Sequence, residues 1–214
     1  MYAQARRFNV PRCKVSAMKK IFSLTILILV LFVANVEAAK TSPADDVYTF
    51  CDAILHGNED SLQKIGLTNA DYENLFISEL TKLFTTYEGI TFSESQVAKV
   101  RESIKSLFKR SEFSTETVSQ KKDKATVKVT VGSFEKITEE LFSKNLPANI
   151  DQMSKEEQVD AFANMIALTL TNLQIVGTAD FTIECTYEKE INMWLATDNE
   201  KFGEVLMNKM FNLE

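Results

Sequence analysis

The sequence predicts an α+β fold, in which a curved antiparallel sheet built from two hairpins packs against several helices. Two separate segments, residues 113–131 and 178–197, contain the alternation of apolar and polar side chains that is typical of half-buried strands. The remaining segments repeat apolar residues every three or four positions, as amphipathic helices do. Because the strands come in adjacent pairs and do not alternate singly with helices, an antiparallel sheet is favoured over a parallel one.

Three helices and one short helical turn are expected ahead of the first hairpin. Ser42, Thr68 and Ser93 begin the helices, since their hydroxyl groups can cap a helix amino-terminus, and Gln96 completes a capping box with Ser93. Glycine is favoured where a helix ends in a left-handed residue. The expected spans are Ser42–Gly57, the short turn Glu59–Ile65 closed by Gly66, Thr68–Gly89 and Ser93–Phe108.

The period changes from that of a helix to that of a strand at Glu112. A Ser/Thr-rich strand is expected over Phe113–Gln120, followed by a solvated polar turn at Lys121–Lys124 and a clear strand over Ala125–Val131. The second hairpin occupies Thr178–Thr197, with its turn at Glu188–Glu190. The helices expected around it are Phe134–Leu146, stopped by Pro147, then Ser154–Leu173 with a capping box to Glu157, and Phe202–Leu213.

One predicted helix is apolar nearly all round between Ala161 and Leu173. A helix of this kind is either buried deeply or covered by a partner. Burial within the monomer is the preferred interpretation. The segment 159–173 therefore also defines the surface through which a protein-interaction role would act.

The first 38 residues have the features of a targeting signal. Residues 18–38 combine a basic start, an apolar run over 21–33 and small residues before a cleavage point between Ala38 and Ala39. Residues 1–17 are interpreted as a disordered upstream extension. The apolar run is shorter than the roughly 20 residues of a membrane span, so cleavage is preferred to an uncleaved anchor, which would be the one expected contact with a membrane.

The predicted mature part, a single domain over residues 39–214, is strongly acidic. Residues 1–38 hold six of the 24 basic groups and one of the 30 acidic groups, which leaves 18 against 29 and a net charge of −11. A field of this sign repels a phosphate backbone. Nucleic acid is therefore not expected as a partner, and a secreted or cell-envelope location is expected from the signal.

No catalytic, cofactor-binding or metal-binding pattern emerges from the residues. The one histidine, His56, lies about 140° round the helix from Cys51, so the two do not form a local nucleophile–base pair. His56 is better explained as a cation at the carboxyl end of a helix. The acid pairs Glu139-Glu140 and Glu156-Glu157 diverge on their helices and are interpreted as solvated surface. Zinc-ligand spacing and phosphate-binding glycine loops are absent from the sequence.

Cys51 and Cys185 are the cysteines of the predicted mature part, and both project from apolar faces. In an exported protein they could form a disulfide, whose long loop would contribute about 4 kcal/mol by chain entropy. Two buried thiols that act as small hydrophobic groups are the preferred interpretation. The sequence alone does not decide between the disulfide and the two buried thiols.

Three segments resemble small exported bacterial domains of the cystatin-like/NTF2-like superfamily, many of which are lipoproteins of Gram-positive bacteria. They are Ala44–Asp60 with its Gly-Asn-Glu-Asp end, Lys124–Val131, and Ile191–Leu195 ahead of the last helix. The resemblance implies a helix-backed curved sheet with a concave pocket and carries over no catalytic residues. Two departures are the absence of a lipobox cysteine, which favours release, and the long helical segment between the hairpins.

These observations favour an exported, non-catalytic binding module that takes an unknown small ligand or a peptide on the concave face of the sheet. A protein-interaction or structural role in the envelope, acting through residues 159–173, is the second hypothesis. An enzyme that uses a buried tyrosine or carboxylic acid of raised pKa inside a pocket is the third.

Overall fold

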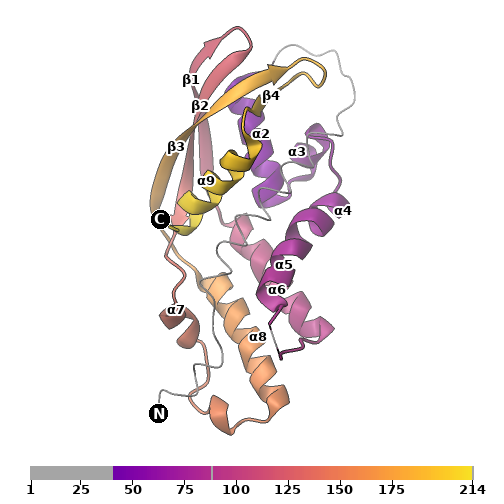
Figure 1. Ribbon diagram of the computed structural model, residues 1–214, viewed down its shortest axis with the longest axis vertical. Helices are drawn as coiled ribbons and strands as arrows, with labels where there is room; N and C mark the ends of the chain where they lie inside the picture. The colour runs from indigo at the N-terminus through magenta and orange to yellow at the C-terminus, as the bar shows by residue number, and fades with distance from the viewer. Residues whose placement is uncertain (1–40, 88, 214) are drawn as a thin grey trace.

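Four strands form a single antiparallel sheet in the order β1-β2-β3-β4 (Figure 1). Both period-two segments therefore share one layer, which confirms the predicted α+β class and the two hairpins. Consecutive strands are neighbours throughout, and a long helical excursion separates β2 from β3. The strands are β1 (Phe113–Lys121), β2 (Lys124–Phe134), β3 (Ile175–Glu188) and β4 (Met193–Ala196).

The computed structural model describes residues 41–87 and 89–213. The predicted extension 1–17, the signal 18–38 and the cleavage point between Ala38 and Ala39 lie outside the described residues.

The helices begin where their capping side chains predict. Ser42, Thr68, Ser93 and Ser154 each accept a hydrogen bond from a backbone N–H in the first turn, and the last three form capping boxes. The helices are α2 (Pro43–His56), α3 (Glu59–Lys64), α4 (Asn69–Asp71), η2 (Tyr72–Ile77, a π-helix), α5 (Ser78–Thr85), α6 (Glu94–Lys109), α7 (Glu139–Ser143), η3 (Ile150–Gln152, a 3₁₀-helix), α8 (Lys155–Asn172) and α9 (Asn199–Phe211).

The predicted helix over Phe134–Leu146 is wrong over most of its length. Strand β2 continues to Phe134, and only the short helix α7 forms in this region. The physical reason is pairing: Gly132, Ser133 and Phe134 are held in extended conformation by the start of β3. Phe134 is also fully buried and stacks on Phe211 with ring centroids 5.6 Å apart, so packing overrides its local helical spacing.

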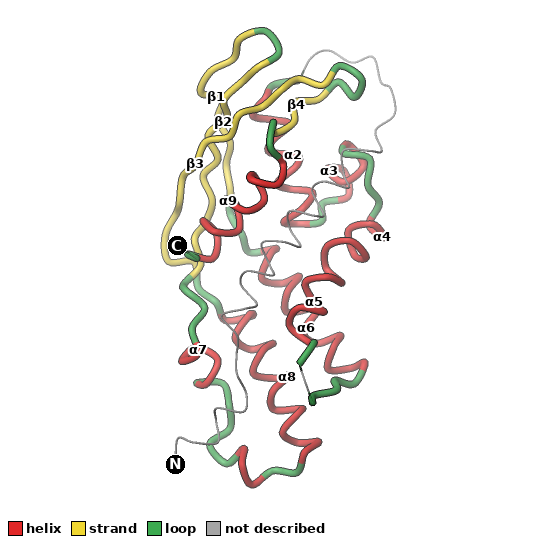
Figure 2. Tube along the Cα trace, viewed as in Figure 1, coloured by secondary structure: helices red, strands yellow, loops and turns green. Residues whose placement is uncertain are grey.

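Helices α2 and α9 cover one face of the sheet, and the opposite face is polar and open to solvent (Figure 2). The covered face presents the alternating apolar residues of β2 and β3. Thr126, Lys128 and Thr130 point to the open face, where they meet Glu184 and Asp180 of β3. The buried residues on the covered face are Ala125, Val127, Val129, Val131, Ile183 and Cys185.

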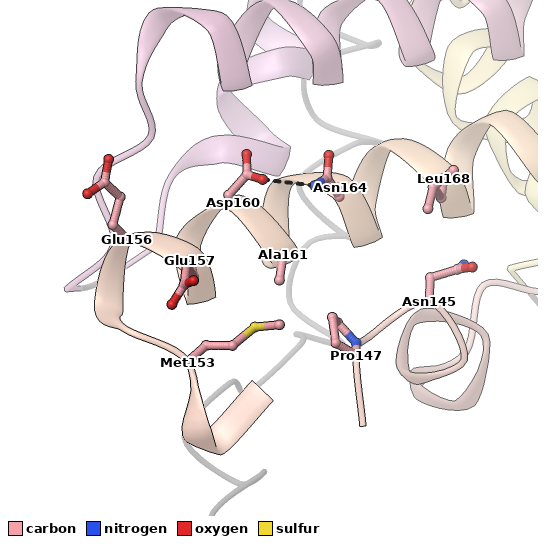
Figure 3. Close-up of a pocket in the computed structure, with 9 residues that line it drawn as sticks. All are labelled: Asn145, Pro147, Met153, Glu156, Glu157, Asp160, Ala161, Asn164 and Leu168. Atoms are coloured by element: carbon pink, nitrogen blue, oxygen red, sulfur yellow. Dashed lines mark hydrogen bonds between the residues drawn. The ribbon is translucent and has the colours of Figure 1, made fainter. Parts of the chain in front are cut away.

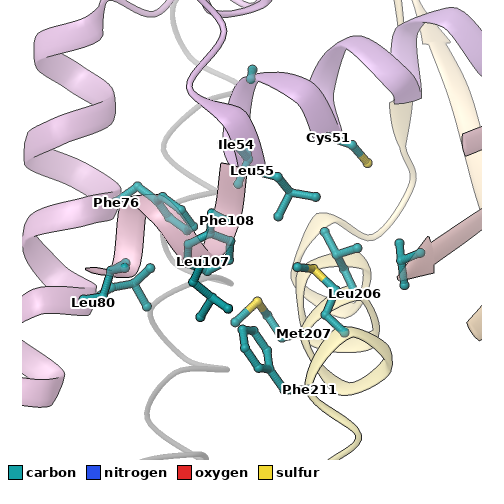
Figure 4. Close-up of a cluster of buried hydrophobic side chains, with 14 of the residues drawn as sticks. Cys51, Ile54, Leu55, Phe76, Leu80, Leu107, Phe108, Leu206, Met207 and Phe211 are labelled. Atoms are coloured by element: carbon teal, nitrogen blue, oxygen red, sulfur yellow. The ribbon is translucent and has the colours of Figure 1, made fainter. Parts of the chain in front are cut away.

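The core continues from the covered face into the helices α5, α6 and α8 as one cluster. Figure 4 shows its centre, where side chains from α2, α6 and α9 meet those of η2 and α5. Phe108 contacts both Phe76 and Phe211, with ring centroids 5.4 and 6.2 Å apart. Burial of each large side chain contributes roughly 1.5–3 kcal/mol, so this junction holds the sheet and the helices together.

One buried carboxylate fixes the start of α2 against the last hairpin. Asp46 is 6% exposed, and its Oδ2 atom accepts hydrogen bonds from the Thr41 hydroxyl and, at 2.8 Å, from the Trp194 backbone N–H. The Trp194 indole N–H donates to the Thr41 carbonyl at 3.0 Å. Burial raises the pKa of Asp46, and the two donated hydrogen bonds act in the opposite direction.

Gly57 ends α2 in a left-handed conformation that also brings it close to a ring. Its φ is 62°, and a Cβ atom added there would lie 2.5 Å from Cε1 of Tyr72. Gly89 has a similar φ of 76° with nothing within 4 Å of its own hypothetical Cβ. Both positions require a residue that tolerates a positive φ, but only Gly57 must also lack a side chain because of the nearby Tyr72 ring. Comparing substitutions at the two glycines therefore separates the effect of conformation from the effect of packing.

Replacing Asp46 by Ala is expected to lower the free energy of unfolding by roughly 1–3 kcal/mol, because the Trp194 N–H loses its acceptor in a buried place. Asp45→Ala is the matched control, since Asp45 is exposed in the same turn and contributes about 0.3–1 kcal/mol through the helix dipole. Urea unfolding of both variants measures the difference. Equal losses would contradict the structural role of Asp46.

Gly57→Ala is expected to destabilise the protein more than Gly89→Ala. Both variants incur the left-handed penalty of roughly 1–2 kcal/mol, but only Gly57→Ala also displaces the Tyr72 ring. Thermal or urea unfolding gives the two values. A Gly89→Ala loss as large as that of Gly57→Ala would show that the Tyr72 contact is unimportant.

Candidate functional site

A hollow runs along α8 beside the connection from α7. Its volume is about 520 Å³ (Figure 3). We call it the α8 groove. Its lining combines apolar side chains with acidic and amide groups: Asn145, Pro147, Met153, Glu156, Glu157, Asp160, Ala161, Asn164 and Leu168.

The polar groups of the α8 groove are held in defined positions. Glu157 closes the capping box of α8 with Ser154, and these hydrogen bonds lower its pKa. Asp160 accepts from the Asn164 side-chain amide at 3.1 Å, as Figure 3 shows. The Glu156 side chain makes no hydrogen bond or ion pair with any other described residue. The groove therefore presents negative charge, including one carboxylate that is available for a partner.

The apolar part of the α8 groove comes from the helix that is apolar nearly all round. Its side chains are mostly buried against the rest of the monomer, which confirms the preferred interpretation of this segment: Ala161, Phe162, Ala163, Met165, Ile166, Ala167 and Leu170 are buried. Leu168 is the exception, with 46% of its surface exposed at the groove. The sequence identified this helix, but it could not identify the one leucine that faces outward.

One space between the sheet and its helices, in the region where the resemblance implies a pocket, is small. The space lined by α2, β4 and α9 has a volume of about 10 Å³, which is roughly the space of one water molecule. Phe50, Phe202 and Trp194 fill it. A second hollow of about 390 Å³ lies outside this layer, at the β3–β4 turn and the start of α9.

The cluster nearest to a catalytic arrangement lies around His56, at the end of α2. Asp52 Oδ1 is 2.8 Å from His56 Nδ1, and its Oδ2 accepts from the Ser61 hydroxyl at 2.6 Å. His56 Nε2 is 2.9 Å from the Ser111 carbonyl oxygen. Both ring nitrogens thus face acceptors, and the position where a nucleophile would stand is occupied by a backbone carbonyl. The cluster ties α2 to α3 and to the segment ahead of β1.

Sequence reasoning assigned His56 to the helix end, which the structure confirms, but missed its partners. Asp52 lies four residues earlier, a spacing that places both side chains on one helix face and was visible in the sequence. Ser111 lies 55 residues away and gave no local signal. Among the described residues no group of His, Cys, Asp and Glu could hold a metal ion.

Within residues 41–87 and 89–213, none of the helices has both the length and the apolar character needed to traverse a lipid bilayer.

Both cysteines are free and buried in the structure. Cys51 lies in α2 and Cys185 in β3, each on the side that faces the core. Burial raises the pKa of both thiols to about 12. Neither thiol is therefore poised to act as a nucleophile in the folded chain.

We expect Cys51 and Cys185 to resist iodoacetamide in the folded protein and to react once it is unfolded in urea, since burial and a raised pKa both suppress the thiolate. Intact mass spectrometry measures the number of labels before and after unfolding. A mass two hydrogen atoms below that of the reduced chain, with no labelling after unfolding, would instead show a disulfide between them.

No protein-family model matches this chain, and no curated protein matches it. Among solved structures, the crystal structure of ycdA, a predicted lipoprotein of Bacillus subtilis, is similar with a TM-score of 0.58 and 18% sequence identity. The match covers 78% of this chain and 55% of that chain, so this protein spans just over half the length of ycdA. The likeness establishes a shared fold, and the cystatin-like/NTF2-like assignment stays a prediction.

Proposed function

We propose that this protein is a non-catalytic binding module that acts outside the cytoplasm and takes a basic polypeptide segment in the α8 groove. The observation that carries the proposal is the groove itself, about 520 Å³ with an apolar floor beside acidic side chains. A segment with one apolar side chain and flanking Lys or Arg residues matches this lining. Leu168 supplies apolar contact, and Glu156 supplies an unpaired carboxylate.

The extracytoplasmic location rests on the predicted signal at residues 18–38 and on the likeness to a protein described as a lipoprotein. The lipobox cysteine expected of a lipoprotein is absent ahead of Cys51. Release into the envelope or the medium is therefore proposed in place of a lipid anchor.

The non-catalytic part of the proposal is supported by where the perturbed groups lie. Burial raises the pKa of Asp46 and Tyr72, and raises that of Tyr87 to about 12. Asp46 is 6% exposed, and neither Asp46 nor either tyrosine lines the α8 groove. Catalytic acids and bases need access to a substrate, which these groups do not have among the described residues.

A polypeptide segment fits the α8 groove better than a small molecule does. Ligand pockets usually enclose 70–90% or more of a small ligand within roughly 300–1,000 Å³. The α8 groove has the volume but lies along the surface of one helix, with Glu156 and Leu168 exposed at its two ends. An extended or helical segment can follow such a groove and bury one apolar anchor along it.

Selection of a random peptide library on the immobilised protein tests the proposal. Enriched sequences are expected to combine Lys or Arg with a large apolar residue, because the α8 groove is acidic with an apolar floor. Affinities of the enriched peptides are then measured by fluorescence polarisation. Like charges placed opposite each other cost several kcal/mol, so Glu156→Lys combined with Asp160→Lys is expected to weaken binding by about tenfold or more.

Glu139→Lys combined with Glu140→Lys is the matched control, since these exposed acids lie on α7 and do not line the α8 groove. It changes the net charge of the protein by the same amount. Equal loss of binding in both double variants would show that peptides respond to overall charge, and a library without any enrichment would overturn the proposed function.

A further inference from the structure

Among the described residues, the first half of β3 pairs with β2 on one side only and forms an edge of the sheet. Strand β4 pairs with β3 only from Cys185 to Glu188, whereas β2 pairs with it along nearly its whole length. Figure 2 shows this part of β3 at the margin of the sheet, with no described segment on its outer side in that view. The residues from Val176 to Thr178 are exposed, Val176 with 62% of its surface.

The register identifies which backbone groups face outward. The N–H of Tyr187 donates to Asp123 on the β2 side, and the carbonyl of Glu184 accepts from Thr197 on the β4 side. Backbone groups of successive residues in a strand point to opposite edges, and the β2–β3 register has no shift between Thr178 and Glu184. The N–H and C=O groups of Thr178, Asp180 and Thr182 therefore point away from β2 toward open space.

Gly177 lies in this edge, directly after Val176, which a shift in the β2–β3 register leaves as an extra residue in β3. A Cβ atom added there would meet nothing within 4 Å, and Gly177 does not have a positive φ. Glycine in a strand costs roughly 0.5–1 kcal/mol relative to alanine. Such a glycine often marks a bulge, as beside Val176 here, or a place where another backbone approaches closely.

Among the described residues, the stretch of this edge from Thr178 to Thr182 has few of the devices that keep sheet edges apart, and the bulge of β3 at Val176 precedes it. Natural edges are protected by lysine, proline, bulges or coverage. The opposite edge, β1, has a bulge at Val118, and its Thr115 and Thr117 hydrogen-bond to the start of α2. The β3 edge has one charged residue between Val176 and Thr182, and this residue, Asp180, is already paired with Lys128 of β2 at 2.7 Å.

We propose that the β3 edge pairs antiparallel with the same edge of a second copy of this chain, which joins two sheets into one. In the register that the side chains favour, Thr178 faces Asp180 of the second copy, and each such pair exchanges both of its backbone hydrogen bonds. Gly177 then faces Phe181 of the second copy, and Ala179 faces its own equivalent. The half-buried Phe181 ring covers the open space above Gly177, an arrangement known to stabilise glycine in sheets.

Neighbouring registers are disfavoured by contacts already present. Shifting the two-fold axis toward Asp180 places the two Asp180 carboxylates directly opposite each other, which is destabilising. Shifting it further requires the backbone of Glu184, whose carbonyl is already bonded to Thr197. The register that pairs Gly177 with Phe181 satisfies both limits.

Sedimentation velocity on the exported protein, over micromolar to hundreds of micromolar concentrations, tests the proposal. The wild type is expected to show a concentration-dependent monomer–dimer equilibrium. Gly177→Val is expected to raise the dimer dissociation constant by about tenfold or more, because the valine occupies the place of Phe181 of the second copy. The same variant is expected to unfold at an unchanged or higher urea concentration, since valine favours strands and its Cβ atom would meet no described atom within 4 Å.

Thr178→Pro removes a backbone N–H that points away from β2, so the pairing of β2 with β3 is not affected. This variant is also expected to abolish the dimer. Val118→Asp on the β1 edge is the control and is expected to leave the dimer unchanged. A wild type that stays monomeric at every concentration overturns the proposal. A dimer that survives both Gly177→Val and Thr178→Pro, or one that Val118→Asp dissociates, overturns it too.

Discussion

The carboxylate of Asp46 joins the first described helix to the last hairpin, across 148 residues of sequence. A buried carboxylate is tolerated only where donors surround it, and here those donors are the Thr41 hydroxyl and the Trp194 backbone N–H. The contact fixes α2 on the sheet, with Trp194 fully buried beside it. In the resulting layer, the space lined by α2, β4 and α9 has a volume of about 10 Å³, which is roughly that of one water molecule.

Local signals predicted most of this architecture. Capping side chains at Ser42, Ser93 and Ser154 set helix starts correctly because their hydrogen bonds are made within one turn. The alternation of apolar and polar residues over 125–131 correctly predicted a strand, because one face of that strand is buried and the other is more exposed to solvent. The helix expected from Phe134 failed where pairing with β3, 41 residues away at Ile175, outweighed local periodicity. Non-local pairing of this kind leaves no trace in a short window of sequence.

The candidate sites were less predictable than the fold, since each depends on segments brought together from afar. The outward position of Leu168 depends on how α8 packs on α6, and the Ser111 carbonyl reaches His56 only after α6 has returned the chain to the end of α2. Gly177 was different: an isolated glycine in a strand pattern is itself a signal of close approach. The structure adds that a bulge lies beside it at Val176 and that a Cβ atom at position 177 would meet no described atom within 4 Å.

The α8 groove and the β3 edge are expected to respond differently to salt, because charge acts differently on the two proposed contacts. A basic segment in the α8 groove is attracted by Glu156 and by the net charge of −11 on residues 39–214, so added salt weakens this interaction by screening it. Two copies meeting at the β3 edge repel each other through the same net charge, while their contact consists of backbone hydrogen bonds and apolar side chains. Because the Debye length falls to about 8 Å at physiological ionic strength, salt favours the second contact while it opposes the first. The two contacts therefore depend on salt in opposite directions, and both dependences follow from the acidity of the chain. Measuring binding and dimerisation at several salt concentrations distinguishes the two contacts without any substitution.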